Sequence, residues 1–467
     1  MTGKEIFLWT VAAVFAAGFL AVNYSNVQLL RGKYRNPDGS NPSGLLLIGG
    51  ICGVLAFCAA PNETLREFWW LPLLLDLGTG PYMLVAVIAT AAAAASASKT
   101  DTAPAREVSP AERSIVGCIF GTAVGDAFGL ACEGLSRNRQ AKMFPNLTSH
   151  QLLPFGRGMC SDDTEHTCML AQSMIETARY PDIDEQAKKF ASNFGWRLRF
   201  WLLGMPAGIG LATLRAILKL WIGFPARYSG VFSAGNGPAM RVALIGVCYG
   251  GDIPRMRALV RAATRITHTD PKAEHGSLAV ALAAHISSTG QDIAPEDYAR
   301  RLRDLLGEDA RELLDLIDGV VQSVGRKETA ADYTARTGSA NGVSGYMFHT
   351  VPAALHVWLS HPGDYRGAIT SIVRLGGDTD TAAAIVGAII GARVGKEGIP
   401  VEWLNCLIEW PRTEAWMESV GIKLADRTTN RTKGYAVPLN WFKLILRNAF
   451  FIPLVLLHGF RRLLPPY

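Results

Sequence analysis

Charged residues are scarce in this chain of 467 residues, because Lys, Arg, Asp and Glu make up only 18% of it and hydrophobic residues make up 49%. The mean hydropathy of +0.17 is high for a purely soluble protein, and the apolar excess lies at the two ends of the chain. Paired cysteines are also lacking, since none of the eight cysteines forms a CxxC motif. This usage favours a reducing compartment and argues against a disulfide scaffold or a structural zinc site.

Signatures of nucleic-acid binding are missing too, because the sequence has no groove-like mixture of basic and aromatic residues and no known nucleic-acid motif. Several of the basic residues behind the formal net charge of +6 stand beside apolar stretches: Arg31, Lys33, Arg35, Arg447, Arg461 and Arg462. Such placement indicates anionic lipid head groups as partners rather than nucleic acid.

The first 98 residues have the composition of a membrane region. Residues 6–22 and 45–60 are apolar runs, and residues 69–97 form a third that Asp76 and a Gly-Thr-Gly-Pro sequence interrupt. A helix of 17 residues is about 25 Å long, close to the roughly 30 Å hydrocarbon core. We expect about three transmembrane helices here. A cleaved signal peptide and a set of buried core helices are the alternatives.

Positive charge in loop 23–43 favours the cytoplasmic side for that loop. With three spans, everything after residue 99 would then also be cytoplasmic. A third region that crosses twice, or not at all, would reverse this orientation. The prediction is a multi-pass membrane protein with a cytoplasmic catalytic domain.

After a proline-containing linker at 99–110, residues 111–426 show helical periodicity and no convincing period-2 strands, so an all-α domain is expected. Residues 199–224 imitate a transmembrane helix, but Arg215 and Lys219 favour a helix of the soluble core. Residues 427–467 form an apolar and basic tail. Pro453 and the distributed charges in it indicate an interfacial helix that contacts membrane lipid rather than a span.

Glycine recurs at every fourth position in two helical segments, as Gly117, Gly121, Gly125 and Gly129, and as Gly387, Gly391 and Gly395. This spacing places each set on one helix face. Glycine weakens a helix, so such stripes make sense where a neighbouring backbone comes close.

Two acidic, hydroxyl-rich clusters lie 215 residues apart, Ser161-Asp162-Asp163-Thr164 and Gly376-Gly377-Asp378-Thr379-Asp380-Thr381, each ahead of an apolar helical run. Either cluster alone reads as an ordinary helix cap. Two carboxylates at one helix start repel each other, however, and the arrangement occurs twice. Because Mg²⁺ and Mn²⁺ prefer oxygen ligands, the pair of clusters predicts a site for two such divalent cations.

Three further segments are candidates for the walls of that site. Asp126 and Glu133 are seven residues apart, and would share one helix face if the helix continues between them. The turn-rich segment 233–241 opens a helix and offers backbone N–H groups to phosphate oxygens, although a plain loop would look similar. His268 is either a ligand donor or a core histidine.

Taken in order, these segments resemble the ADP-ribosylglycohydrolase family of the dinitrogenase-reductase-activating type. The resemblance covers about residues 111–400 and rests on Gly121 to Glu133, Ser161 to Thr164, Gly235-Asn236-Gly237 through Arg241, Thr267-His268, and Gly377 to Thr381. It implies an orthogonal all-α bundle with two Mg²⁺ or Mn²⁺ ions that cleaves ADP-ribose from a modified protein or another ADP-ribose conjugate.

The resemblance also implies roles for individual residues. The implied metal ligands are Ser161, Asp162, Asp163, Asp378, Asp380 and Thr381. The implied substrate-binding residues are Asp126, Ser233, Gly235, Asn236 and His268. Asp162 or Asp163 would orient or deprotonate a metal-bound water that attacks the anomeric carbon, and Glu133 would be the general acid or the gate over the leaving group.

Three departures from the family pattern stand out. Ser161 replaces a threonine that is usual there, Ala234 replaces a larger residue seen in some members, and the membrane-like ends are additions. The alternative function is a non-catalytic ADP-ribose-binding membrane protein on the same fold. Such a protein would be expected to have lost metal carboxylates, and all of them are present here.

Overall fold

The computed structural model describes residues 3–30, 48–60, 62, 71–72 and 108–466 and divides the chain into two compact units, 1–106 and 107–467. In the first unit, α1 (Gly3–Leu30) packs against α2 (Ile48–Ala59). The α1 segment Ile6–Tyr24 is long and apolar enough to cross a membrane, whereas α2 has only 12 residues. The third apolar run, residues 69–97, lies almost wholly outside the described residues, so the number of spans stays a prediction.

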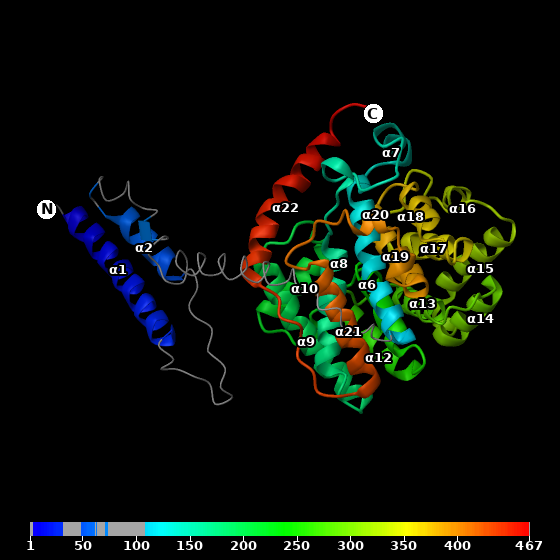
Figure 1. Ribbon diagram of the computed structural model, residues 1–467, viewed down its shortest axis with the longest axis horizontal. Coiled ribbons are helices and arrows are strands. Elements are labelled where there is room, and N and C mark those ends of the chain that lie inside the picture. The colour runs from blue at the N-terminus through cyan, green and yellow to red at the C-terminus, as the bar shows by residue number, and fades with distance from the viewer. Residues whose placement is uncertain (1–2, 31–47, 61, 63–70, 73–107, 467) are drawn as a thin grey trace, which may run out of the picture. The chain divides into compact units, whose positions relative to one another are not determined.

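The second unit is built from helices, and the described residues contain isolated β-bridges but no strand, so the all-α prediction is confirmed (Figure 1). Two antiparallel helices, α6 (Pro110–Gly129) and α19 (Thr379–Val394), form its centre. Nearly every residue of both is buried. Pro110–Cys132 is also apolar enough to span a membrane, but all of it is buried inside this unit.

Helices α6 and α19 are covered by a first layer of helices that pack directly on them. This layer consists of α8 (Asp162–Thr177), α11 (Ala239–Tyr249), α13 (Pro271–Ser288), α17 (Met347–Ser360), α18 (Tyr365–Val373) and α21 (Glu414–Asn430). The remaining helices lie further out or fill corners: α7 (Arg137–Met143), α9 (Ile183–Leu203), α10 (Leu211–Trp221), α12 (Ile253–Arg265), α14 (Pro295–Leu306), α15 (Arg311–Gly325), α16 (Ala330–Arg336), α20 (Val401–Leu404) and α22 (Trp441–Arg461).

The two glycine stripes face each other between α6 and α19. A Cβ added to Gly121 would lie 2.0 Å from the carbonyl oxygen of Gly387, and one added to Gly117 would lie 2.1 Å from that of Gly391. At the other end, a Cβ on Gly129 would lie 2.3 Å from the carbonyl oxygen of Thr379. The close backbone approach expected from the stripes is therefore present. It brings the first turn of α19, with its acidic cluster, against the end of α6.

The start of α6 fixes the register of this pair. Ser109 caps the helix by accepting a hydrogen bond from the backbone N–H of Glu112, and Pro110 occupies the first turn. Arg113 then donates to the backbone carbonyls of Arg393 and Val394 at the end of α19. An arginine at one helix start thus satisfies carbonyls that the antiparallel partner leaves without intrahelical bonds.

Two expectations need correction. Residues 199–224 are not one core helix, because α9 ends at Leu203, α10 begins at Leu211, and side chains such as Phe200 and Leu218 are exposed. Residue 426 is not a boundary either. The tail helix α22 belongs to the second unit and buries Arg447, Asn448 and Phe451 in it.

Candidate metal centre and ligand cavity

Three buried aspartates meet where α6, α8 and α19 converge. One carboxylate oxygen from each of Asp126, Asp163 and Asp380 lies within 4.8 Å of the others. These residues are 254 positions apart at the extreme and at most 5% exposed. The two acidic clusters predicted from the sequence to form one site therefore do meet, and Asp126 joins them.

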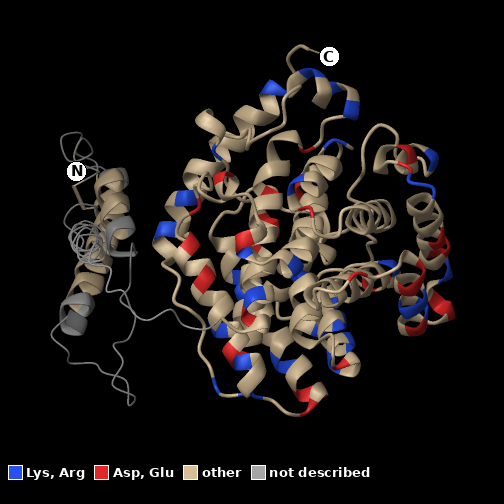
Figure 2. Cartoon of the chain, turned by 45° about the vertical axis from the view of Figure 1, so that its right-hand side comes forward, with Lys and Arg blue, Asp and Glu red and all other residues tan. Residues whose placement is uncertain are grey.

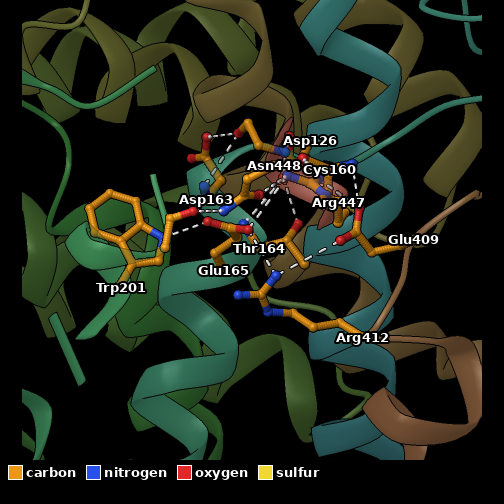
Figure 3. A network of polar contacts seen from close by, with 12 residues as sticks. Asp126, Cys160, Asp163, Thr164, Glu165, Trp201, Glu409, Arg412, Arg447 and Asn448 are labelled. Carbon is orange, nitrogen blue, oxygen red and sulfur yellow. Dashed lines mark hydrogen bonds and ion pairs between the residues drawn. The ribbon is translucent and has the colours of Figure 1, made fainter. Parts of the chain in front are cut away.

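The N-terminus of α8 is held by two acceptors. Ser161 caps it by accepting from the backbone N–H of Asp163, and the Ser161 hydroxyl donates to Asp163 Oδ2 at 2.9 Å. Asp126 accepts from the backbone N–H of Ser161 at 2.9 Å and from the backbone and hydroxyl of Thr164 (Figure 3). Asp126 was expected to bind substrate, but it lies behind this loop and orients it.

The second acidic cluster depends on two glycines in the left-handed region, Gly376 with φ 74° and Gly377 with φ 84°. The Gly377 N–H donates to the carbonyl of Leu135, and the Asp378 N–H donates to that of Val343, both at 2.7 Å. A Cβ on Gly377 would lie 2.0 Å from the Val343 oxygen. Only glycine therefore fits between the segments that contain Leu135 and Val343. The backbone hydrogen bonds to these two segments fix the position of Asp378.

Asn236 links the turn of residues 233–241 to the acidic cluster. Its side-chain amide donates to Asp378 Oδ2 at 2.6 Å and to the Thr350 hydroxyl at 2.9 Å. Its backbone N–H donates to the carbonyl of Gly345. Asn236 thus positions a carboxylate in addition to lining the cavity described next.

A cavity of about 400 Å³ lies over these carboxylates, within the range of small-molecule sites, roughly 300–1,000 Å³. Ten of the predicted site residues line it: Glu133, Ser161, Asp162, Ser233, Gly235, Asn236, His268, Asp378, Asp380 and Thr381. The other two, Asp126 and Asp163, lie beneath its floor. The cavity also has lining residues that the sequence did not indicate, including Phe451 and Val455 of α22.

The carboxylates have the donor set and the electrostatics of a cation site. Asp163 Oδ1 and Asp380 Oδ1 are buried and have no hydrogen-bond partner among the described residues. Burial, reinforced by neighbouring carboxylates, holds the pKa of Asp162, Asp163 and Asp380 well above its usual range, and burial raises the pKa of Asp126 to about 6. Because the charged forms are this unfavourable without a counter-ion, the residues present fit divalent cations such as Mg²⁺ or Mn²⁺.

His268 is a buried, neutral side chain at the cavity wall. Burial, and then the charge of Arg241, lowers its pKa to about 3. The Thr267 hydroxyl accepts from Arg241 at 2.7 Å and lies 2.9 Å from His268 Nδ1. His268 therefore presents a neutral imidazole to the cavity.

Glu133 is not on the helical face of Asp126, because α6 ends at Gly129 and a 3₁₀ turn, Leu130–Cys132, intervenes. The condition for a shared face, a helix that continues from Asp126 to Glu133, is therefore not met. The Glu133 side chain is 42% exposed in the cavity, and one carboxylate oxygen lies 3.9 Å from the guanidinium of Arg462. Desolvation raises its pKa, Arg462 opposes the rise, and Asp378 adds to it.

A buried ionic network lies next to the loop that carries Ser161 and Asp162, and it was not predicted. Glu165 accepts from Arg412 at 2.8 Å, and Glu409 accepts from Arg447 at 2.8 Å, with all four side chains at most 2% exposed (Figure 3). Arg447 also donates to the carbonyl of Cys160, the residue before Ser161. Although burial alone would raise the pKa of Glu165, Arg412 and Arg447 lower it below its usual range.

This network ties the tail helix to the site. Arg447 belongs to α22, and its neighbour Asn448 donates to the carbonyl of Gly204 at the end of α9. The only sequence signal for these contacts was Arg447 inside an apolar helix, and the sequence does not indicate which residue it would contact. The tail that was predicted to contact membrane lipid thus also anchors the loop that carries Ser161 and Asp162.

Comparison with known proteins identifies relatives of this unit. The family model described as ADP-ribosylglycohydrolase matches residues 107–435. An uncharacterized protein of Archaeoglobus fulgidus is 30% identical over 68% of this chain and 97% of its own length. ADP-ribosylhydrolase ARH3 of Xenopus tropicalis is 27% identical over 65% of this chain and 93% of its own.

Two more relatives are similar over a comparable span. ADP-ribosyl-[dinitrogen reductase] glycohydrolase of Rhodospirillum rubrum is 24% identical over 62% of this chain and 89% of its own length. A solved ADP-ribosylglycohydrolase-related protein complex contains a chain that is 26% identical, with a TM-score of 0.45, over 68% of this chain and 99% of that one.

Proposed function

Because the chain belongs to the ADP-ribosylglycohydrolase family, we propose that it is a hydrolase that releases ADP-ribose from a modified acceptor. The observation that carries this proposal is the stacking of a 400 Å³ polar cavity on a floor of buried aspartates, two of whose oxygens have no partner among the described residues. A merely structural acidic cluster would not need an open cavity above it. A plain binding pocket would not need carboxylates held at such unfavourable pKa values.

Six residues would hold two Mg²⁺ or Mn²⁺ ions: Ser161, Asp162, Asp163, Asp378, Asp380 and Thr381. Cations bound there would lower the pKa of a bound water toward neutrality. Asp162 is partly exposed to the cavity, so it is placed to orient the attacking water and take its proton. Asp163 is more deeply buried and serves to hold the loop and the ligand set.

The opposite wall would hold ADP-ribose. Ser233 offers its hydroxyl, the turn at Gly235 and Asn236 lines the wall, and His268 offers a neutral imidazole. The water oxygen forms a bond to the anomeric carbon while the bond from that carbon to the acceptor atom breaks. Glu133, whose pKa is raised by desolvation, is placed to donate a proton to the leaving acceptor.

The N-terminal apolar helices lead us to infer that residues 1–98 anchor the enzyme in a membrane, with the catalytic domain on the cytoplasmic side. Support comes from the α1 segment Ile6–Tyr24, which has a mean hydropathy of 2.0 and little burial. A protease-protection assay on sealed vesicles tests the orientation. In sealed vesicles whose cytoplasmic face points inward, cleavage of the domain only after the membrane is permeabilised would agree with it.

The activity test uses purified protein, Mg²⁺ or Mn²⁺, and a panel of conjugates: ADP-ribosylated arginine and serine peptides, modified nucleic-acid ends, poly(ADP-ribose) and a small ester. We expect release of free ADP-ribose from at least one conjugate, and EDTA should block it. Asp380→Asn and Asp162→Ala should abolish release while the domain stays folded. Asp315→Asn, an exposed acid on α15, is the matched control and should retain activity.

Full activity in Asp380→Asn would contradict the metal-site assignment. Tight binding of ADP-ribose without release from any conjugate would instead favour the alternative, a non-catalytic ADP-ribose-binding protein on the same fold.

A further inference from the structure

Two stretches of the catalytic unit contain no acidic residue. Residues 186–251 have eight Lys or Arg and no Asp or Glu, and residues 427–467 have seven and none. Elsewhere the charges are mixed: Arg303 on α14 pairs with Asp318 on α15, and Figure 2 shows acidic and basic residues side by side on outer helices. The two acid-free stretches therefore differ from the rest of the surface.

The same stretches also carry most of the exposed large hydrophobic side chains. Of 24 such side chains in residues 108–466, 20 lie in 186–251 or 427–467, although these make up less than a third of that region. On α22, Leu446, Phe450, Leu457 and Phe460 share one helix face and are 44–67% exposed. The opposite face holds Arg447 and Phe451, which are buried against the domain.

Both stretches meet at the mouth of the cavity. Its rim includes Leu211 of α10, which is 61% exposed, and Ser233, whose neighbour Phe232 is 79% exposed. Phe451 and Val455 of α22 form another part of the wall. The Asn448 bond to the Gly204 carbonyl joins α22 to the end of α9, so helices from both stretches wall one opening and carry exposed apolar groups on their outer faces.

We propose that this face, formed by α9, α10 and α22, docks on an anionic lipid bilayer, so that the ligand cavity opens at the membrane surface. Exposed Leu, Phe and Trp would enter the head-group region, and basic side chains would reach the lipid phosphates, each adding about 1 kcal/mol. This inference about the substrate rests on the proposed function: the substrate is an ADP-ribosyl group carried by a membrane-bound acceptor.

A second copy of the chain fits this face less well. In a two-fold dimer the same patch meets itself, which would place the basic residues of α10 and α22 against one another. The acids of these three helices, Asp184 and Glu185, lie in the first turn of α9. A bilayer supplies both an apolar layer and negative charge. The α1 segment, apolar enough to span a membrane, would hold the same chain close to lipid and raise the effective concentration of the docking face.

The test separates docking from anchoring by using the 107–467 domain, a compact unit with its own core that corresponds to nearly the whole length of relatives such as the Archaeoglobus protein. Binding is measured by flotation with vesicles of phosphatidylcholine alone or mixed with phosphatidylserine. We expect binding to the anionic vesicles, weakened by salt. The double variant Phe450→Ser and Leu457→Ser should bind about tenfold more weakly or worse, since two apolar side chains no longer enter the lipid.

The matched control is Ile253→Ser with Val401→Ser, two exposed apolar side chains outside the docking face; it should bind like the parent. Equal thermal stability of the two double variants excludes a folding defect. Absence of binding to anionic vesicles, or undiminished binding of the α22 variant, would overturn the proposal. If the parent domain is a dimer without lipid and the α22 variant is a monomer, a second copy covers this face instead.

Hydrolysis separates this proposal from the proposed function. On a soluble ADP-ribosylated peptide, the α22 variant should match the parent, because neither Phe450 nor Leu457 lines the cavity. On a vesicle-anchored form of the same peptide, the variant should be about tenfold slower. If no conjugate releases ADP-ribose but the domain still binds anionic vesicles, the proposed hydrolase activity is refuted and the docking proposal is retained.

Discussion

The packing of α6 on α19 makes a quantitative prediction about one methyl group. In Gly121→Ala, the new Cβ would lie 2.0 Å from the Gly387 carbonyl oxygen, whereas ordinary contact begins near 3.4 Å. The obstacle is backbone, so it cannot rotate away as a side chain would. The two helices must therefore separate by more than 1 Å, and the separation extends to the other glycine contacts along the stripe.

The expected loss is about 2 kcal/mol of unfolding free energy. Overpacking a well-packed core costs roughly 1–3 kcal/mol, here at the upper end because four close contacts lie in register. Replacing a helical glycine by alanine regains up to about 1 kcal/mol of helix propensity. Gly319→Ala on α15 isolates that gain, because the nearest atom to its new Cβ is a Tyr333 ring carbon at 4.0 Å. It should be stabilising by about 0.5–1 kcal/mol.

The assay is thermal and urea unfolding of the 107–467 domain, with the two alanine variants measured side by side. A difference of about 3 kcal/mol corresponds to roughly 4 °C in Tm for a domain of this size. Gly121→Ala should also bind Mn²⁺ more weakly, because the displaced α19 carries Asp380. If Gly121→Ala proves as stable as Gly319→Ala, the α6–α19 approach drawn from the glycine contacts is wrong.

Other predictions concern the charges around the site. The native state keeps protons on Asp126, Asp162, Asp163 and Asp380 above their ordinary pKa, so the metal-free domain should lose stability as the pH rises through the raised values. Mg²⁺ or Mn²⁺ should therefore raise Tm more at about pH 8 than at about pH 5. At pH 8, a hundredfold excess over Kd should stabilise the domain by about 2.7 kcal/mol; an equal shift at both pH values would contradict this. Arg412→Met leaves Glu165 partly unpaired in the interior and should cost about 3–5 kcal/mol in urea unfolding. Arg300→Met, in an exposed pair with Asp297, should cost at most about 1 kcal/mol, and similar losses in the two variants would mean that the buried network is solvated.

The sequence was sufficient wherever a local pattern has one physical explanation. The stripe from Gly117 to Gly129 required a close backbone, and the repeated Asp pairs required a counter-ion, so the central helices and the carboxylate floor could be anticipated. The contacts of Asp126 with the start of α8 could not be anticipated, because that helix begins 35 residues later in the chain. The contact between Arg447 and Cys160 spans 287 positions and has no local signature at either end.

The charges around the floor of the cavity bear on whether a protein side chain could neutralise its buried carboxylates. The network beneath it contains two arginines and two glutamates, so it is neutral by itself and has no positive charge to spare. His268 is neutral, and Arg241 is committed to His166, Thr267 and a backbone carbonyl. For Asp163 and Asp380, burial and neighbouring carboxylates dominate, and no described cation is among the main influences on their pKa. Without a bound cation these carboxyls are therefore neutralised by protonation, and the arginines serve instead to hold the loop that carries Ser161 and Asp162.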